Sequence, residues 1–337
     1  MMRKSLQISL LLLLSVLLGI NKANAQVDPH FTQYYVYPAW LNPALTGAFD
    51  GQYRVSGIYR TQWGNISSPY STPGFSFEYT TDKNINWGVS VLNQKAGNGG
   101  YNYTTAYGNI SYTGLRFGKD ETKRVTFGFQ AGMIQRRFDR NKLSFGDQWN
   151  PITGYNPNNQ TADIITNNRA TDLDASFGVM YFDAQAGKKS NLFAGASLSH
   201  LTEFDDDFSG TGTQSFPMRF NLHGGVRFTI SNVFSVTPNF LYVKQGSAQE
   251  TMLGAYGQYK VNNTTDLMIG ANYRTEDAIS PFVGFTHKNM MMGFSYDINT
   301  SSLGRIANGA NSFEISLTYI GKKKTKTPEI EFVCPRL

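Results

Sequence analysis

The sequence predicts an all-β protein, a transmembrane antiparallel β-barrel of about 14 strands. An export signal begins the chain, and apolar and polar residues then alternate at every second position in about fourteen stretches. After the signal there is no run of eighteen consecutive apolar residues, so a helical membrane protein is excluded. Such alternation places apolar side chains toward lipid and polar side chains toward an aqueous interior.

The first 25 residues have the features of a secretory signal peptide. Arg3 and Lys4 precede an apolar run from Ile8 to Ile20, and small residues end the segment at Ala25. The apolar core is shorter than the roughly 20 residues that a spanning helix needs. We therefore expect cleavage after Ala25, export, and localisation in the outer membrane, where lipid covers the barrel.

The barrel is expected to span residues 51–320. Val125, Phe127 and Phe129 alternate with small or polar residues, and a second stretch directs Arg219 and Arg227 inward. The expected strands are 53–63, 73–81, 85–95, 103–117, 123–138, 171–183, 190–201, 217–229, 233–244, 250–260, 265–274, 279–287, 290–298 and 312–320. A soluble β-sandwich is disfavoured, because some 270 residues of strand pattern would need two sandwiches with a linker that is absent.

The connections between these strands alternate in length. Short connections at 81–84, 231–232, 261–264 and 287–289 alternate with long ones at 64–72, 96–102, 139–170, 202–216 and 299–311. Outer-membrane barrels have short periplasmic turns and longer extracellular loops. This pattern predicts extracellular long loops, with both chain termini on the short-turn, periplasmic side.

Two segments lie outside the strand pattern. Residues 26–50 contain prolines and dense aromatic residues, which argue against a long helix and favour packing inside or under the barrel. Residues 321–337 form a basic tail that is expected to be periplasmic. The tail is interpreted either as a solvated extension or as a docking segment with apolar anchors that adds a strand to a partner.

Charge and motifs exclude several functions. Half of the net charge of +6 comes from Arg3, Lys4 and Lys22, and the tail carries the rest, so nothing indicates nucleic-acid binding. The four histidines have no zinc-binding spacing, and no Gly-x-Ser-x-Gly elbow occurs, so we predict neither enzymatic activity nor a cofactor. The acidic run 205–207 is interpreted as a solvated loop, and a divalent-cation site is the alternative.

The expected inward-facing arginines leave two alternatives open. Arg54, Arg60, Arg219 and Arg227 would line an aqueous pore if they are unpaired. The same side chains would close the lumen if they pair with Glu78 or with other carboxylates.

Three short motifs carry a resemblance to a known family. They are Asp28-Pro29-His30-Phe31-Thr32-Gln33-Tyr34, Asn42-Pro43-Ala44-Leu45-Thr46-Gly47 and the ending Cys334-Pro335-Arg336-Leu337. With the barrel pattern, they resemble the PorP/SprF family of type IX secretion system outer-membrane proteins from Bacteroidota. The residues that match the family's opening are Phe31, Gln33, Tyr34, Asn42, Pro43, Ala44 and Gly47. Tyr37-Pro38 departs from the family's usual Asn-Pro, which affects local packing only.

The resemblance implies a non-enzymatic barrel of the type IX secretion and gliding machinery. Such a barrel supports secretion or surface attachment of cargo proteins or adhesins, with machinery components or a large secreted surface adhesin as partners. Candidate partner-binding residues in the tail are Lys322, Lys323, Lys324, Ile330, Phe332, Cys334, Pro335, Arg336 and Leu337. The alternative function is an outer-membrane channel or porin for small solutes.

Overall fold

The structure, a computed structural model, describes residues 28–64, 69–81, 83–97, 100–118, 121–162, 167–202, 216–301 and 311–322. Three sequence-based expectations concern residues outside these ranges. They are the signal peptide 1–25, the acidic run 205–207, and the tail candidates Lys323, Lys324, Ile330, Phe332, Cys334, Pro335, Arg336 and Leu337. In the described residues, no helix is long and apolar enough to cross a membrane.

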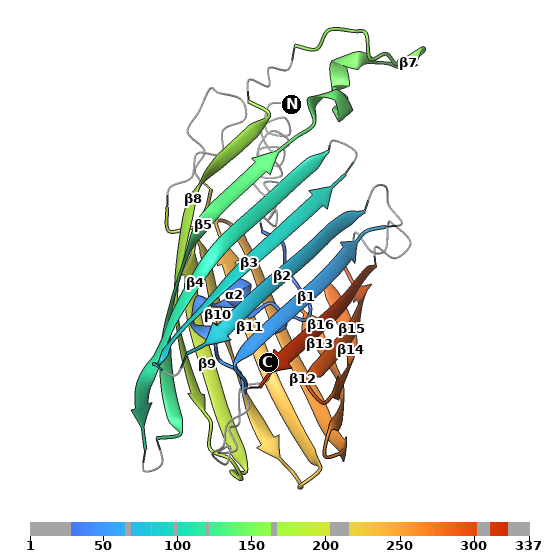
Figure 1. Ribbon diagram of the computed structural model, residues 1–337. Coiled ribbons are helices and arrows are strands. Elements are labelled where there is room, and N and C mark those ends of the chain that lie inside the picture. The colour runs from blue at the N-terminus through green and yellow to red at the C-terminus, as the bar shows by residue number, and fades with distance from the viewer. Residues whose placement is uncertain are drawn as a thin grey trace, which may run out of the picture.

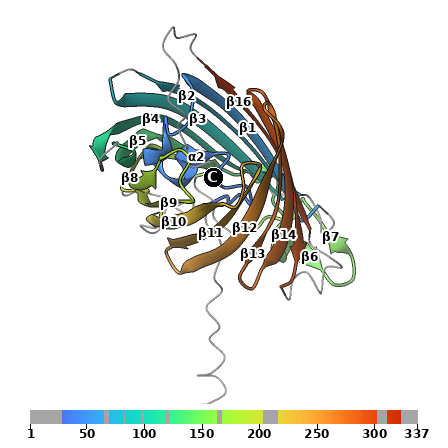
Figure 2. The same cartoon turned by 90° about the horizontal axis from the view of Figure 1, so that it is seen from below.

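Fourteen antiparallel strands close into one barrel, which confirms the predicted fold class (Figures 1 and 2). The strands are β1 (Tyr53–Gln62), β2 (Tyr70–Thr80), β3 (Ile85–Ala96), β4 (Tyr101–Phe117), β5 (Lys123–Arg137), β8 (Arg169–Asp183), β9 (Ser190–Ser199), β10 (Arg219–Thr229), β11 (Phe234–Gln245), β12 (Ala248–Asn262), β13 (Thr265–Arg274), β14 (Ala278–His287), β15 (Met290–Asn299) and β16 (Ser312–Gly321). Each pairs with its sequence neighbours, and β1 pairs with β16 to close the barrel. Closure leaves no unpaired strand edge.

The alternation in the sequence arises from the two faces of the barrel wall. In β5, Thr126 and Gln130 are buried in the interior, whereas Phe127 and Phe129 are exposed on the outer surface. At the short-turn end, Phe77 and Tyr79 pack around the indole of Trp87, at 5.6 and 5.7 Å between ring centroids. Such an aromatic cluster is typical of the membrane interface of outer-membrane barrels.

One long connection contains its own structure. Between β5 and β8, the short strands β6 (Trp149–Asn150) and β7 (Gly154–Tyr155) form a hairpin that projects beyond the barrel at the long-loop end (Figure 1). The opposite end of the barrel carries the short turns, including the two residues between β12 and β13.

Residues 28–50 lie inside the barrel, and we call them the plug (Figure 2). The plug contains the short helix α2 (Pro38–Leu41) and the 3-10 turn η1 (Pro43–Leu45). It leads into β1 at the short-turn end, where the backbone N–H of Gln52 donates to the carbonyl of Gly321 at 2.7 Å.

Asp28, the first described residue, lies at the long-loop end of the lumen, opposite the short-turn end at which β1 begins. The Asp28 carboxylate contacts Tyr103, His200 and Arg219, which lie at the long-loop ends of β4, β9 and β10. The expectation that both chain termini lie on the short-turn side is therefore wrong for this end of the described chain. Alternation predicts strand directions, but it carries no information about an irregular segment that threads the lumen.

A glycine in the barrel wall makes room for the plug. A Cβ atom on Gly128 of β5 would lie 2.2 Å from the backbone nitrogen of Ala44, closer than any real contact. Within the plug, Gly47 has a φ of +75°, a conformation that residues with a side chain adopt only with strain. The plug backbone therefore packs directly on the barrel backbone.

We predict that Gly128→Ala loosens the plug and leaves the barrel intact. The added methyl group overlaps plug backbone, and such overpacking costs about 1–3 kcal/mol. Limited proteolysis of the purified protein in detergent should show faster cleavage within residues 28–50.

Gly57→Ala is the matched control, because a Cβ atom there meets nothing within 4 Å. Equal cleavage rates for the two variants would contradict the close approach at Gly128.

Candidate functional site in the barrel lumen

The first family motif docks on β15 and β16. The backbone N–H groups of Thr32 and Gln33 donate to the two carboxylate oxygens of Glu314, at 2.6 and 2.8 Å. The Gln33 side chain donates to Ser295 Oγ at 3.1 Å and accepts from Ser316 Oγ at 2.7 Å. This part of the plug is therefore held by residues near the other end of the chain.

Phe31 and Tyr34 of the same motif are buried at the plug surface. Phe31 packs edge-on against Tyr37, with 6.0 Å between ring centroids. The Tyr34 hydroxyl donates to Asn239 Oδ1 on β11 at 2.9 Å. Both rings belong to the apolar core that fills the lumen.

The second family motif is organised by the Asn42 side chain. Its Oδ1 accepts from the backbone N–H of Ala44 at 2.9 Å, which caps the turn that begins at Pro43. Its Nδ2 donates to the carbonyl of Val179 in the barrel wall at 3.0 Å. Gly47 ends the motif, and its N–H donates to Glu78 Oε2 at 2.9 Å.

The structure therefore places all seven residues of the opening motifs in the plug, where six contact the barrel wall and Phe31 packs on Tyr37. Of the tail candidates, the structure describes Lys322 alone, whose ammonium group lies 3.2 Å from Asp50 Oδ2. Both of these side chains are more than two-fifths exposed, so the pair adds little stability.

Arg60 is the centre of a buried ionic network. Its guanidinium donates to Glu314 Oε2 and to Asp297 Oδ2, each at 2.7 Å. Arg274 donates to the same Asp297 oxygen at 2.7 Å. Thr32 of the plug accepts from Arg60 at 3.1 Å and donates to Asp297 at 2.7 Å. The network thus connects four strands of the wall, β1, β13, β15 and β16, to the plug.

A second network fixes the start of the plug. Asp28 Oδ2 lies 2.8 Å from both His200 Nε2 and Arg219 Nη1, and Asp28 Oδ1 accepts from the Tyr103 hydroxyl. The other imidazole nitrogen of His200 lies 2.8 Å from Asp174 Oδ2. His200 therefore bridges two carboxylates, an arrangement that favours the imidazolium.

The pKa values of this network follow from its charges. Burial lowers the pKa of His200, but the attraction of Asp28 and hydrogen bonds to Asp174 and Asp28 outweigh burial and raise it to about 9. Burial raises the pKa of Asp28, but the charges of His200 and Arg219 and two hydrogen bonds hold it well below its ordinary value. Both groups are therefore charged at neutral pH.

The structure decides between the two alternatives for the inward arginines. Arg54 pairs with Glu78 at 2.8 Å, as one alternative expected, and Arg60 and Arg219 pair with the carboxylates described above. Arg227 donates to Ser235 Oγ at 3.3 Å. Arg54, Arg60 and Arg219, which pair with carboxylates, help to close the lumen rather than line an open pore.

Sequence analysis missed the partners Asp28, Asp297 and Glu314. Glu314 does carry a local signal, because it occupies an inward position between Phe313 and Ile315 in the alternation of the last strand. Nothing local indicates which arginine it meets.

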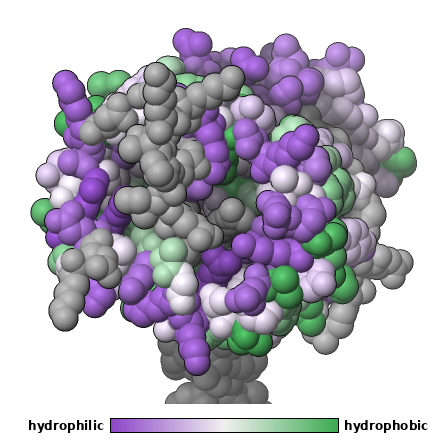
Figure 3. Space-filling model, turned by 60° about the horizontal axis from the view of Figure 1, so that its bottom comes forward, coloured by the Kyte–Doolittle hydropathy of each residue, from purple (hydrophilic) through white to green (hydrophobic). Residues whose placement is uncertain are grey.

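The lumen contains cavities on both sides of the plug. The larger, of about 510 Å³, lies at the long-loop end between the plug and strands β10 to β13. The smaller, of about 290 Å³, lies at the short-turn end and includes Asp50, Thr80 and Arg116. Hydrophilic side chains surround a hollow at that end (Figure 3). In the described part of the chain, no group of three or more His, Cys, Asp or Glu side chains could hold a metal ion.

We expect the long-loop end of the plug to loosen in alkaline solution. The pKa of His200 is raised from 6.5 to about 9. Its stabilising contribution is therefore complete below the unfolded pKa and is lost as the pH rises through 9, at a cost on the order of 3 kcal/mol. The contribution of Asp28 is also stabilising but has the opposite pH dependence, because its pKa is lowered: it is lost only in strong acid. Hydrogen exchange of residues 28–40, followed between about pH 6 and pH 10, measures the effect.

His200→Gln should remove most of this pH dependence and increase exchange at neutral pH. His287→Gln, at the short-turn end of β14, serves as the control and should behave like the unaltered protein. Equal alkaline loosening in the His200 variant would rule out His200 as its source.

Comparisons with known proteins agree with this architecture. The toluene transporter TbuX of Ralstonia pickettii is similar with a TM-score of 0.50 and 12% identity, over 83% of this chain and 92% of that one. The monoaromatic hydrocarbon channel CymD has a TM-score of 0.48 and 11% identity, over 89% and 96% of the two chains. At 12% identity, the similarity to TbuX shows the barrel fold alone. No curated protein sequence matches the chain.

The family model for the type IX secretion system membrane protein PorP/SprF matches residues 23–319, and the chain therefore belongs to the PorP/SprF family.

Proposed function

We propose that this protein is a non-enzymatic outer-membrane component of the type IX secretion machinery that supports secretion or surface attachment of exported proteins. Family membership over residues 23–319 carries the proposal. The exported partner is a cargo protein or a large surface adhesin such as those of gliding motility. Cleavage after Ala25 and insertion in the outer membrane belong to the same proposal.

The plug supports this role over that of an open channel. Residues 28–50 fill the lumen and are bonded to opposite sides of the barrel wall, at Glu314 and at Val179. The two cavities lie at opposite ends of the lumen with the plug between them. A barrel in this state offers two closed mouths to partners rather than a path for solutes.

The two ends of the barrel suit different partners. If the short turns face the periplasm, as in other outer-membrane barrels, Lys322 and the tail after it lie on the side of the periplasmic machinery. The long loops and the β6–β7 hairpin then lie on the outside, where an exported protein arrives. We propose that the tail docks to machinery components through its basic and apolar residues.

We predict that the unaltered protein conducts ions poorly in planar bilayers, because the plug occupies the lumen. Deletion of residues 28–50 should produce stable conductance steps, provided that the barrel still folds. Heat-modifiable migration on gels checks the barrel in each preparation. Large, stable conductance of the unaltered protein would favour the channel instead.

We predict that deletion of residues 323–337 abolishes co-purification of secretion components from native outer membranes, while the barrel still inserts. Mass spectrometry after mild detergent extraction measures the partners. A variant in which Lys322, Lys323 and Lys324 are replaced by Gln tests the charge contribution separately, because it keeps the apolar anchors. Unchanged recovery of partners after the deletion would refute the docking role of the tail.

A further inference from the structure

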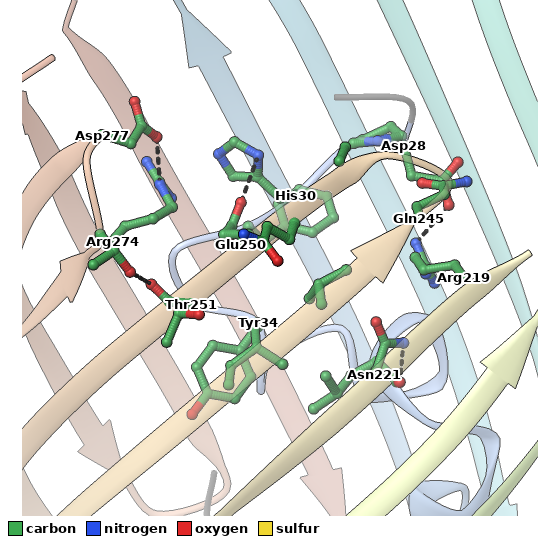
Figure 4. A pocket seen from close by; sticks show the side chains of 18 of the residues that line it. Asp28, His30, Tyr34, Arg219, Asn221, Gln245, Glu250, Thr251, Arg274 and Asp277 are labelled. Atoms are coloured by element: carbon green, nitrogen blue, oxygen red, sulfur yellow. Dashed lines mark hydrogen bonds and ion pairs between the residues drawn. The ribbon is translucent and has the colours of Figure 1, made fainter. Parts of the chain in front are cut away.

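The cavity at the long-loop end is built from both the plug and the barrel wall (Figure 4). Its volume of about 510 Å³ is within the usual range for sites that bind small molecules. His30, Tyr34 and Trp40 line it from the plug, and Leu241 and Glu250 line it from β11 and β12. Its lining combines aromatic and aliphatic surface with a few charged groups.

Glu250 is the charged group in this cavity with the least compensation. One of its carboxylate oxygens lies 3.5 Å from Nδ1 of His30. The other oxygen is buried and has no hydrogen-bond partner in the described part of the chain. The side chain as a whole is only 18% exposed, so solvent compensates little of its charge.

His30 does not supply the missing positive charge. The Arg60 guanidinium lies 3.0 Å from His30 Nε2, and because a guanidinium only donates, this nitrogen accepts. Burial lowers the pKa of His30, and the charges of Arg274 and Arg60 lower it further, against the opposing effect of Asp297. The imidazole is therefore neutral, and its proton lies on Nδ1, toward Glu250.

The neighbouring arginines are already bound to other carboxylates. Arg60 pairs with Asp297 and Glu314, and Arg274 pairs with Asp297 and Asp277. Two buried arginines therefore face three buried carboxylates, with Glu250 in excess. A buried carboxyl group in excess is unfavourable as an anion: it either takes up a proton or pairs with a cation.

We propose that this cavity binds an organic cation, an ammonium or guanidinium group on a short apolar chain, with Glu250 as its counter-ion. Tyr34, Leu241 and Val243 line the cavity and supply contact surface for the chain that carries the cation. On the proposed function, the source of this group is a Lys or Arg side chain of an exported polypeptide at the long-loop end.

Titration calorimetry on the purified full chain in detergent tests the proposal, with n-butylammonium as the probe and n-butanol as its neutral counterpart. We expect binding of the ammonium and at least about tenfold weaker binding of the alcohol, because ion pairing in a poorly hydrated site is lost. Glu250→Gln should weaken n-butylammonium binding by at least about tenfold. Glu121→Gln removes an exposed carboxylate at the short-turn end and should leave binding unchanged.

Glu250→Asp covers the case in which the Gln variant fails to fold. It keeps the charge, so binding should remain within a few-fold of the unaltered protein. Equal binding of the alcohol and the ammonium, unchanged binding after Glu250→Gln, or no binding of any probe would overturn the proposal.

Capped lysine separates the two sources of the cation. N-acetyl-lysine-amide should bind at least as tightly as n-butylammonium if the cavity accepts a polypeptide side chain. Failure of the capped lysine to bind would restrict the site to free amines and overturn the polypeptide source. Secretion by the Glu250→Gln strain is measured in parallel. Intact secretion by this strain without cation binding would contradict the polypeptide source and leave the proposed function standing. The deletion of residues 323–337 is a separate test, because loss of secretion there concerns the proposed secretion function and not the cation site.

Discussion

The requirement that a buried backbone be hydrogen-bonded governs the arrangement of the lumen. The plug is mostly irregular, so its N–H and C=O groups cannot pair within a helix or a sheet. Inward-facing side chains of the wall supply the partners instead. Ser197 and Asn221 donate to the carbonyl of Leu41, at 2.7 and 2.8 Å, and Arg219 donates to that of Trp40 at 2.7 Å. The polar rows that alternation directs inward therefore serve as binding partners for the plug, in addition to any contact with water.

Buried charge acts in the same direction. Replacing a buried ion pair by apolar residues is often neutral in stability, so such pairs are better explained by the geometry that they impose. Arg60 contacts the plug at Thr32 and the wall at Asp297 and Glu314. Any slip of the plug along the lumen would break the hydrogen bonds of Thr32 to Arg60 and Asp297. It would also separate the Asp28 carboxylate from His200 and Arg219. We therefore regard the ionic networks as the elements that fix the position of the plug.

A closed barrel with a fixed plug has two independent faces. The long-loop mouth contains the cavity with an uncompensated Glu250, and the short-turn end contains the exit toward the basic tail. This division is consistent with a PorP/SprF protein that binds different partners on the two sides of the membrane.

The sequence by itself determined the barrel and its fourteen strands, because these depend on local alternation. It offered Glu78 as one partner of Arg54, and the structure decided that the two side chains pair. It also determined that residues 31–47 contain a distinctive motif, but not what the motif binds. Only the tertiary structure decided that Asp28 lies at the long-loop end and that Thr32 meets Glu314, 282 residues away in the chain. Alternation reports which face of a strand a residue occupies, a property of two or three neighbouring residues. Contacts across the lumen depend on strand register, barrel closure and the path of an irregular segment, and no local pattern encodes these.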